Sequence, residues 1–145
     1  MVTKMNFEIR DKKLLLDMIQ ASIDYYIETG SKQELIFAKV PSDIIDRNFQ
    51  HIFKEKGIEP RVNDAWINAF PIGHSSMAGH NHVGEVWVYY LSTPENCGEI
   101  ILVDQNKTIT PQEGDLIVVP KGENHKVTEN KSQDYRISLA MELIY

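Results

Sequence analysis

Hydrophobic residues in the first third of the chain recur at three- and four-residue steps, the spacing that places side chains on one face of an α-helix. One stripe lies within residues 11–30, where Gly30 is expected to end a helix. A second lies within residues 43–57, with Ser42 as the expected N-cap and Gly57 as the C-terminal end. Residues 35–40 form a short extended piece between them. The stripes comprise Leu14, Leu15, Met18, Ile19, Ile23, Tyr26 and Ile27, then Ile45, Phe49, Ile52 and Phe53.

From residue 61 onward the pattern changes to short runs rich in Val, Ile, Tyr and Trp, separated by turn clusters such as STPENCG and PQEG. The runs are AWINAF, EVWVYYL, EIILV, DLIVVP, HKVTE and YRISLAMELIY. Many short strands without helices between them are typical of an antiparallel sandwich or small barrel. The sequence therefore predicts a mainly β single domain, 1–145. Its helical N-terminal part, 1–60, is expected to pack two helices on one sheet of a β core, 61–145.

Composition narrows the function classes. With 42% hydrophobic and 25% charged residues, the chain resembles an ordinary globular protein. A net charge of −6 and the lack of a Lys/Arg cluster argue against nucleic-acid binding. No apolar run approaches the roughly 20 residues that a membrane span needs. A single cysteine, Cys97, cannot form an internal disulfide, and its loop lacks the basic neighbours of a reactive thiol. We therefore expect a cytoplasmic protein without nucleic-acid or membrane partners.

Two histidines, one residue apart, precede the run EVWVYYL. On a strand, His80 and His82 would point to the same face, so both imidazoles would converge on one metal ion. The alternative is a polar strand end in solvent. His125, which ends GDLIVVPKGENH, is the best third ligand because a tight turn would hold it at a strand end. Its alternative is a histidine on a surface loop.

The last run, YRISLAMEL, alternates in a way that divides its side chains between two faces. Tyr135, Ile137, Leu139 and Met141 form an apolar face that is expected to pack against the N-terminal helices. Arg136 and Ser138 then face the interior of the sandwich. A buried, unpaired guanidinium is costly, so Arg136 requires an anion there. This is either a protein carboxylate or a ligand carboxylate, which Ser138 would help to bind.

Other polar and aromatic residues have two interpretations each. Asn68 alternates with Trp66 and Phe70, and either contacts a pocket ligand or makes a structural hydrogen bond. Glu85 is a possible fourth metal ligand, but strand alternation places it opposite His80 and His82 unless a turn at residues 83–84 intervenes. Of Trp87, Tyr89 and Tyr90, at least two are expected in the core, and the remainder would line a pocket.

Taken together, these motifs resemble a small 2-oxoglutarate/Fe(II)-dependent oxygenase, most similar to short prolyl-hydroxylase-like proteins of bacteria and phages. The resemblance covers residues 61 to 144, and its most specific element is His125 followed eleven residues later by Arg136-x-Ser138. It implies a double-stranded β-helix, or jelly roll. It also implies a catalytic Fe(II) bound by His80, His82 and His125, and a 2-oxoglutarate cosubstrate. In the family, the positions of Arg136 and Ser138 bind the far carboxylate of that cosubstrate, and we expect Asn68 to assist.

The chain departs from that family in one respect, because the oxygenases usually have a carboxylate where this chain has His82. A second resemblance is to the cupins, since GDLIVVPKGENHKVTEN is similar to the second cupin motif. It implies a metalloenzyme that does not use 2-oxoglutarate. A third interpretation is a non-catalytic jelly-roll binding protein. No motif identifies the substrate, which is expected to be a small molecule or a peptide. A homodimer through exposed strands or terminal helices is also expected.

Overall fold

The structure is a computed structural model that describes residues 3–30 and 35–145. Its elements, in chain order, are β1 (Thr3–Asn6), α1 (Lys12–Glu28), β2 (Ile36–Lys39), α2 (Ser42–Lys56), β3 (Arg61–Phe70), β4 (Ser76–His80), β5 (Glu85–Ser92), β6 (Ile100–Leu102), β7 (Lys107–Ile109), β8 (Asp115–Val119), β9 (His125–Val127) and β10 (Arg136–Ile144).

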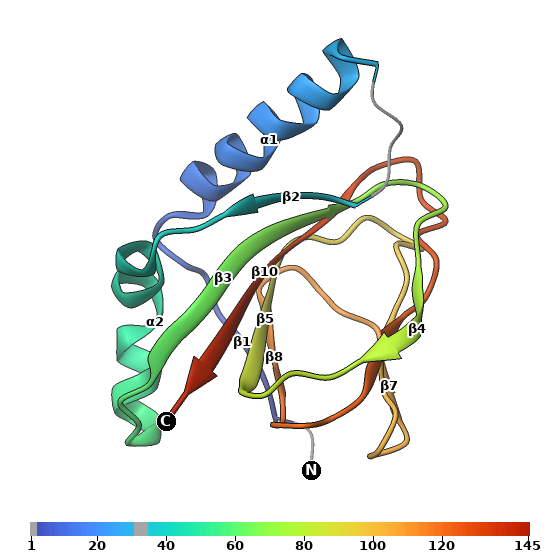
Figure 1. The fold of residues 1–145 in the computed structure, drawn as a ribbon. Coiled ribbons are helices and arrows are strands. Elements are labelled where there is room, and N and C mark those ends of the chain that lie inside the picture. The colour runs from blue at the N-terminus through green and yellow to red at the C-terminus, as the bar shows by residue number, and fades with distance from the viewer. Residues whose placement is uncertain (1–2, 31–34) are drawn as a thin grey trace.

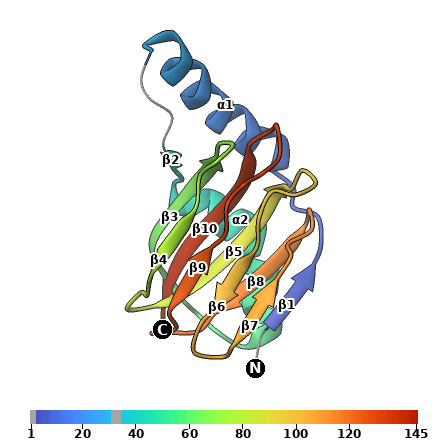
Figure 2. The same ribbon diagram turned by 90° about the vertical axis from the view of Figure 1, so that its right-hand side faces the viewer.

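Two antiparallel sheets lie face to face. The larger has the strand order β1-β8-β5-β10-β3-β2, and the smaller has the order β4-β9-β6-β7. Helices α1 and α2 cover the outer face of the larger sheet, and the smaller sheet covers the inner face (Figures 1 and 2). This arrangement confirms the expected mainly β fold with two helices on one sheet. Within the described ranges, the helices lack the apolar length that a membrane crossing requires.

The helix boundaries follow the sequence closely. Helix α1 buries Leu15, Ile19 and Ile23, which are spaced four residues apart on one face. The expected N-cap of α2 was wrong by one residue, because Pro41 is the cap and Ser42 is already helical. Pro41 has an extended backbone, and its carbonyl accepts a hydrogen bond from Ile44 N at 3.1 Å. Gly57 ends α2 with a left-handed φ of 69°, as predicted.

Strand alternation separates two apolar cores. The core under the helices contains the outward-facing residues of β10, which are Ile137, Leu139, Met141 and Leu143. The core between the sheets contains Ala140 and the inward-facing residues of β5. Arg136 and Ser138 are buried on this inner side, where both contribute to the lining of a pocket. The division of YRISLAMEL into two faces is therefore confirmed.

Three strands escaped the sequence analysis. Strand β1 lies at the edge of the larger sheet and pairs with β8. Strand β7 has only three residues, and β4 contains Gly79 and few apolar side chains. None of the three has the apolar alternation that identifies a strand in a sequence. Each is recognised only from its backbone pairing with a neighbouring strand.

A substitution of Phe49 on α2 would measure how much the helices contribute to the stability of the fold. Its side chain is fully buried, and its ring contacts Phe7 and Tyr89 at centroid distances of 6.1 and 5.8 Å. We expect Phe49→Ala to lower the free energy of unfolding by about 3–5 kcal/mol, as measured by urea denaturation. The exposed neighbour Gln50 is the control, and Gln50→Ala should cost less than about 0.5 kcal/mol. Equal stability of the two variants would contradict this packing.

Candidate metal centre and its pocket

Three histidines converge between the two sheets. His80, His82 and His125 each offer a ring nitrogen, and these nitrogens all lie within 4.8 Å of one another. The ring centroids are 4.2 Å apart for His80 and His125, 5.0 Å for His80 and His82, and 5.4 Å for His82 and His125. His125 is buried, His82 is half-buried and His80 is exposed at the rim. This grouping matches the ligand set that the sequence suggested.

Each histidine is placed by a different part of the chain. Strands β4 and β9 pair antiparallel with His80 directly opposite His125. The expectation that His80 and His82 share a strand was wrong, because β4 ends at His80 and His82 lies in the irregular segment that follows. A backbone hydrogen bond from Gly122 N to His82 O, at 3.1 Å, ties this segment to the turn before β9. The convergence of His82 thus depends on the turn and not on strand alternation.

Desolvation and the neighbouring histidines favour the neutral form of two of the imidazoles. Desolvation, and then the neighbouring His82, lowers the pKa of His80. Desolvation, and then the neighbouring His80, lowers the pKa of His125 to about 4. At neutral pH these two rings therefore hold free lone pairs, which is the form that binds a metal ion.

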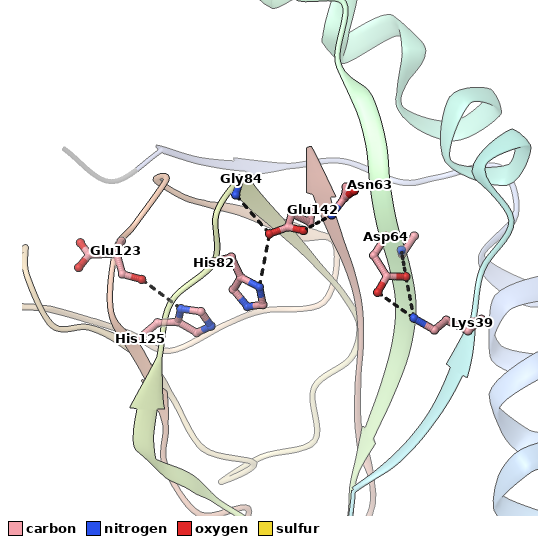
Figure 3. A network of polar contacts seen from close by, with 9 residues as sticks. Lys39, Asn63, Asp64, His82, Gly84, Glu123, His125 and Glu142 are labelled. Atoms are coloured by element: carbon pink, nitrogen blue, oxygen red, sulfur yellow. Dashed lines mark hydrogen bonds and ion pairs between the residues drawn. The ribbon is translucent and has the colours of Figure 1, made fainter. Parts of the chain in front are cut away.

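Oxygen atoms lie beside the Nδ1 atoms of two of the rings (Figure 3). His125 Nδ1 lies 3.4 Å from the carbonyl oxygen of Glu123, and His82 Nδ1 lies 3.6 Å from Glu142 Oε2. Such contacts to Nδ1 leave Nε2 free for a metal. A hydrogen bond from Asn63, and then one from Gly84, lowers the pKa of Glu142, so that its side chain is a carboxylate at neutral pH.

Glu142 was missed by the sequence analysis. The signal was present, because the alternation that places Arg136, Ser138 and Ala140 on the inner face of β10 continues to Glu142. Glu85 makes different contacts. Its Oε1 accepts hydrogen bonds from Trp87 Nε1 at 2.7 Å and from Tyr145 Oη at 2.9 Å. It is not part of the histidine cluster.

A pocket of about 160 Å³ opens beside the histidines. The three candidate ligand-binding residues from other strands, Arg136, Ser138 and Asn68, line the same pocket. Because Ser138 on β10 pairs with Asn68 on β3, their side chains lie next to each other. The other residues that line the pocket are Leu35, Trp66, Phe70, His74, Ser76, Val86, Val88, Tyr90, Ile100, Val127 and Ala140.

Arg136 is buried in this pocket without an anion. Its side chain is 2% exposed, and its Cζ lies 4.2 Å from the centre of the Phe70 ring. Within residues 3–30 and 35–145, Arg136 Nε and Nη1 have no hydrogen-bond partner, and neither does Asn68 Oδ1. Burial lowers the pKa of Arg136. No carboxylate of the described residues pairs with it, so the first of the two interpretations of Arg136 lacks support.

The aromatic residues of β5 divide as expected. Trp87 and Tyr89 belong to the core under the helices, and Tyr90 faces the pocket. Burial raises the pKa of Tyr90 to about 12, so its hydroxyl stays protonated. Cys97 is buried, and burial raises the pKa of its thiol, which does not favour a reactive cysteine.

Solved structures with a similar fold include two oxygenases. A viral collagen prolyl hydroxylase from Paramecium bursaria Chlorella virus-1, in complex with 2OG, has a TM-score of 0.68 at 14% identity, covering 98% of this chain and 94% of that one. The non-haem α-ketoglutarate-dependent carbocyclase SnoK from nogalamycin biosynthesis has a TM-score of 0.67 at 9% identity, covering 98% and 78%. This chain has the jelly-roll fold of the 2-oxoglutarate/Fe(II)-dependent oxygenases.

Structural similarity extends beyond that group. The salicylate 1,2-dioxygenase of Pseudoaminobacter salicylatoxidans has a TM-score of 0.56 at 11% identity, covering 90% of this chain but only 32% of that one. No protein-family model matches this chain, and no curated protein matches its sequence. Structural similarity therefore identifies the fold, whereas the chemistry depends on the residues of the site.

The lowered pKa of His125 makes the stability of the metal-free protein depend on pH. An unfolded histidine titrates near pH 6.5, so between about pH 6.5 and 4 the unfolded state binds more protons than the folded state. Stability is therefore lost as the pH falls through this window. Between pH 7 and pH 5, we expect the free energy of unfolding of the wild type to fall by about 1–2 kcal/mol more than that of His125→Gln, as measured by urea denaturation. Equal losses would show that His125 is not buried in its neutral form.

Proposed function

We propose that this protein is a non-haem Fe(II)- and 2-oxoglutarate-dependent oxygenase. The observation that carries the proposal is a buried Arg136 guanidinium, two of whose nitrogens lack partners within the described residues, in the same pocket as three converging histidines. A protein seldom buries a cation without an anion, because desolvation costs several kcal/mol. The pocket therefore has the features of a binding site for an anionic ligand that also reaches a metal.

The histidine cluster suits a transition metal. Three ring nitrogens within 4.8 Å of one another provide the imidazole ligands that iron, copper and zinc accept. Two of the rings have an oxygen atom next to Nδ1, the arrangement that fixes metal-binding histidines. The residues present thus fit an iron ion held by His80, His82 and His125.

The rest of the pocket suits a small dicarboxylate. Its volume, about 160 Å³, is below the 300–1,000 Å³ of sites for drug-sized ligands. Arg136 can bind a carboxylate through two parallel N–H···O bonds, and the hydroxyl of Ser138 and the amide of Asn68 lie on the adjoining strand positions. A 2-oxoglutarate molecule has one carboxylate for Arg136 and a keto-acid group for the metal.

The bound cofactors and the protein's side chains would have different roles in the reaction. When bound, Fe(II), 2-oxoglutarate and O₂ supply the oxidising power, with succinate and CO₂ formed as the substrate is hydroxylated. The three histidines would hold the metal, and Arg136 with Ser138 would bind the far carboxylate. Apolar side chains of Val86, Val88, Ile100 and Ala140 line the pocket and limit water within it. The substrate, a small molecule or a peptide, would approach from the rim near His80.

One observation favours a second candidate function, a cupin-type metalloenzyme that does not use 2-oxoglutarate. Among the described residues, the candidate ligand set consists of three imidazoles without a carboxylate. Such a site carries less negative charge than two histidines and a carboxylate, which weakens the attraction for a hard dication. This candidate gives no reason for the unpartnered nitrogens of Arg136.

Anaerobic titration of the metal-free protein distinguishes the two candidates. Addition of Fe(II) and then 2-oxoglutarate should produce the visible charge-transfer band of the chelate. We expect Arg136→Ala to weaken the affinity for 2-oxoglutarate by about 10- to 100-fold, because it removes the charged hydrogen bonds to the far carboxylate. We expect His125→Ala to abolish tight metal binding.

Arg61→Ala is the control, since Arg61 is an exposed arginine on β3. It should bind 2-oxoglutarate as the wild type does. Tight Fe(II) binding without any effect of 2-oxoglutarate would reject the oxygenase and support the cupin-type enzyme. Absence of metal binding would reject both and leave a non-catalytic jelly-roll protein.

A further inference from the structure

Glu142 is a buried carboxylate directly behind one of the candidate metal ligands. The residue is 9% exposed and lies near the end of β10. Its Oε1 accepts a hydrogen bond of 2.6 Å from Asn63 Nδ2, and its Oε2 accepts one of 3.2 Å from Gly84 N. The same Oε2 lies 3.6 Å from His82 Nδ1 (Figure 3). Strand β3 and the segment after β4 therefore both contact β10 at this one carboxylate.

The backbone is shaped to permit this contact. A Cβ atom at position 84 would lie 2.6 Å from Leu143 O and 2.9 Å from Glu142 Cγ, distances that no side chain tolerates. Only glycine lets the segment after β4 come so close to β10. In the pairing of β10 with β3, the register shifts between Glu142 and Leu143, at the same point. The segment that carries His82 thus packs closely against β10 at Glu142.

The charge of Glu142 is not balanced by a basic side chain. Within the described part of the chain, the nearest basic group to Glu142 is the His82 ring, which is charged only when protonated, and no lysine or arginine pairs with Glu142. Burying a carboxylate without a cation is unfavourable. For comparison, the carboxylate of Asp64 pairs with Lys39 at 2.7 Å near the surface. A cation on the far side of His82 would supply the missing positive charge.

Alternative roles for Glu142 account for less of this geometry. A residue that only joined β3 to β10 would need the hydrogen bond from Asn63 and nothing more. Its second oxygen instead faces His82 Nδ1 and the backbone of Gly84. The side chain is therefore placed to orient His82, which lies outside any strand and has a backbone hydrogen bond from Gly122 N but not the strand pairing that places His80 and His125.

We propose that Glu142 is a positioning residue for the metal centre, which holds the Nδ1–H of His82 and gives a three-imidazole site the negative charge that its ligands lack. The proposal rests on the proposed function only in requiring that a divalent metal occupies the three histidines. A carboxylate behind a histidine ligand fixes the tautomer and makes Nε2 a stronger donor. In this chain, the negative charge that the three ligands lack would come from a carboxylate behind one of the ligands, His82.

Metal affinity tests the proposal without any assay of turnover. The metal-free wild type and Glu142→Gln are titrated with Co(II), and the visible absorption of the bound ion is followed. Because glutamine keeps the size of the side chain and removes its charge, we expect Glu142→Gln to bind Co(II) about 10- to 100-fold more weakly. The matched control is Glu85→Gln, which removes the same charge from β5 at a site outside the histidine cluster. It should bind within about twofold of the wild type.

A second variant separates positioning from charge and covers the case in which Glu142→Gln does not fold. Asn63 is exposed, and Asn63→Ala releases the Glu142 carboxylate without removing it. We expect a weakening smaller than that of Glu142→Gln but larger than that of Glu85→Gln. In the Zn(II)-loaded protein, imidazole ¹⁵N spectra should place the His82 proton on Nδ1, and this signal should be lost or shifted in Glu142→Gln.

The possible outcomes separate this proposal from the proposed function. If the wild type binds neither Co(II) nor Zn(II), both are rejected. If the wild type binds metal while Glu142→Gln and Asn63→Ala bind it as tightly as Glu85→Gln does, only the role of Glu142 is rejected. A metal-loaded wild type whose His82 proton lies on Nε2 would also overturn it, because Nδ1 would then be the ligand atom.

Discussion

The alternation of side chains along β10 is the constraint on which the site depends. This strand is hydrogen-bonded to β3 on one edge and to β5 on the other, and both of its faces are buried. A slip of one residue would move Ile137 and Leu139 into the pocket between the sheets and Arg136 into the core under the helices. The apolar contacts beneath the helices therefore fix the register, and the register fixes which polar groups face the pocket.

The same strand sets the distribution of charge in the site. Arg136 and Glu142 face the same side, six residues apart, which corresponds to roughly 20 Å along a strand. The buried guanidinium lies at the end that lines the pocket beside Phe70, and the buried carboxylate lies behind His82. A ligand that bridges a metal and Arg136 would meet a cation at each end, with Glu142 offsetting part of the charge of the metal.

The comparisons show how little the fold decides about chemistry. Structures described as a collagen prolyl hydroxylase, a carbocyclase and a salicylate dioxygenase share this architecture with the chain at 9–14% identity. Within the described residues of this chain, the candidate metal-binding group consists of three histidines without a carboxylate among them. The proposed function therefore rests on the pocket, where the unpartnered nitrogens of Arg136 favour an anionic ligand and the three imidazoles would bind a metal.

The sequence by itself determined the elements whose pattern is local. The helices, the β5 and β10 alternation and the inward direction of Arg136 and Ser138 follow from side-chain periodicity, which a single segment contains. The stripe predicted for the first helix was too wide, because Leu14 and Ile27 are exposed. The meeting of His80 with His125 was decided by pairing of β4 with β9, segments that lie 45 residues apart and carry no distinctive pattern. The placement of His82 and its contact with Glu142 needed a turn, a close approach at Gly84 and a register shift. Only the folded chain brings these together, because they depend on backbone contacts between distant segments.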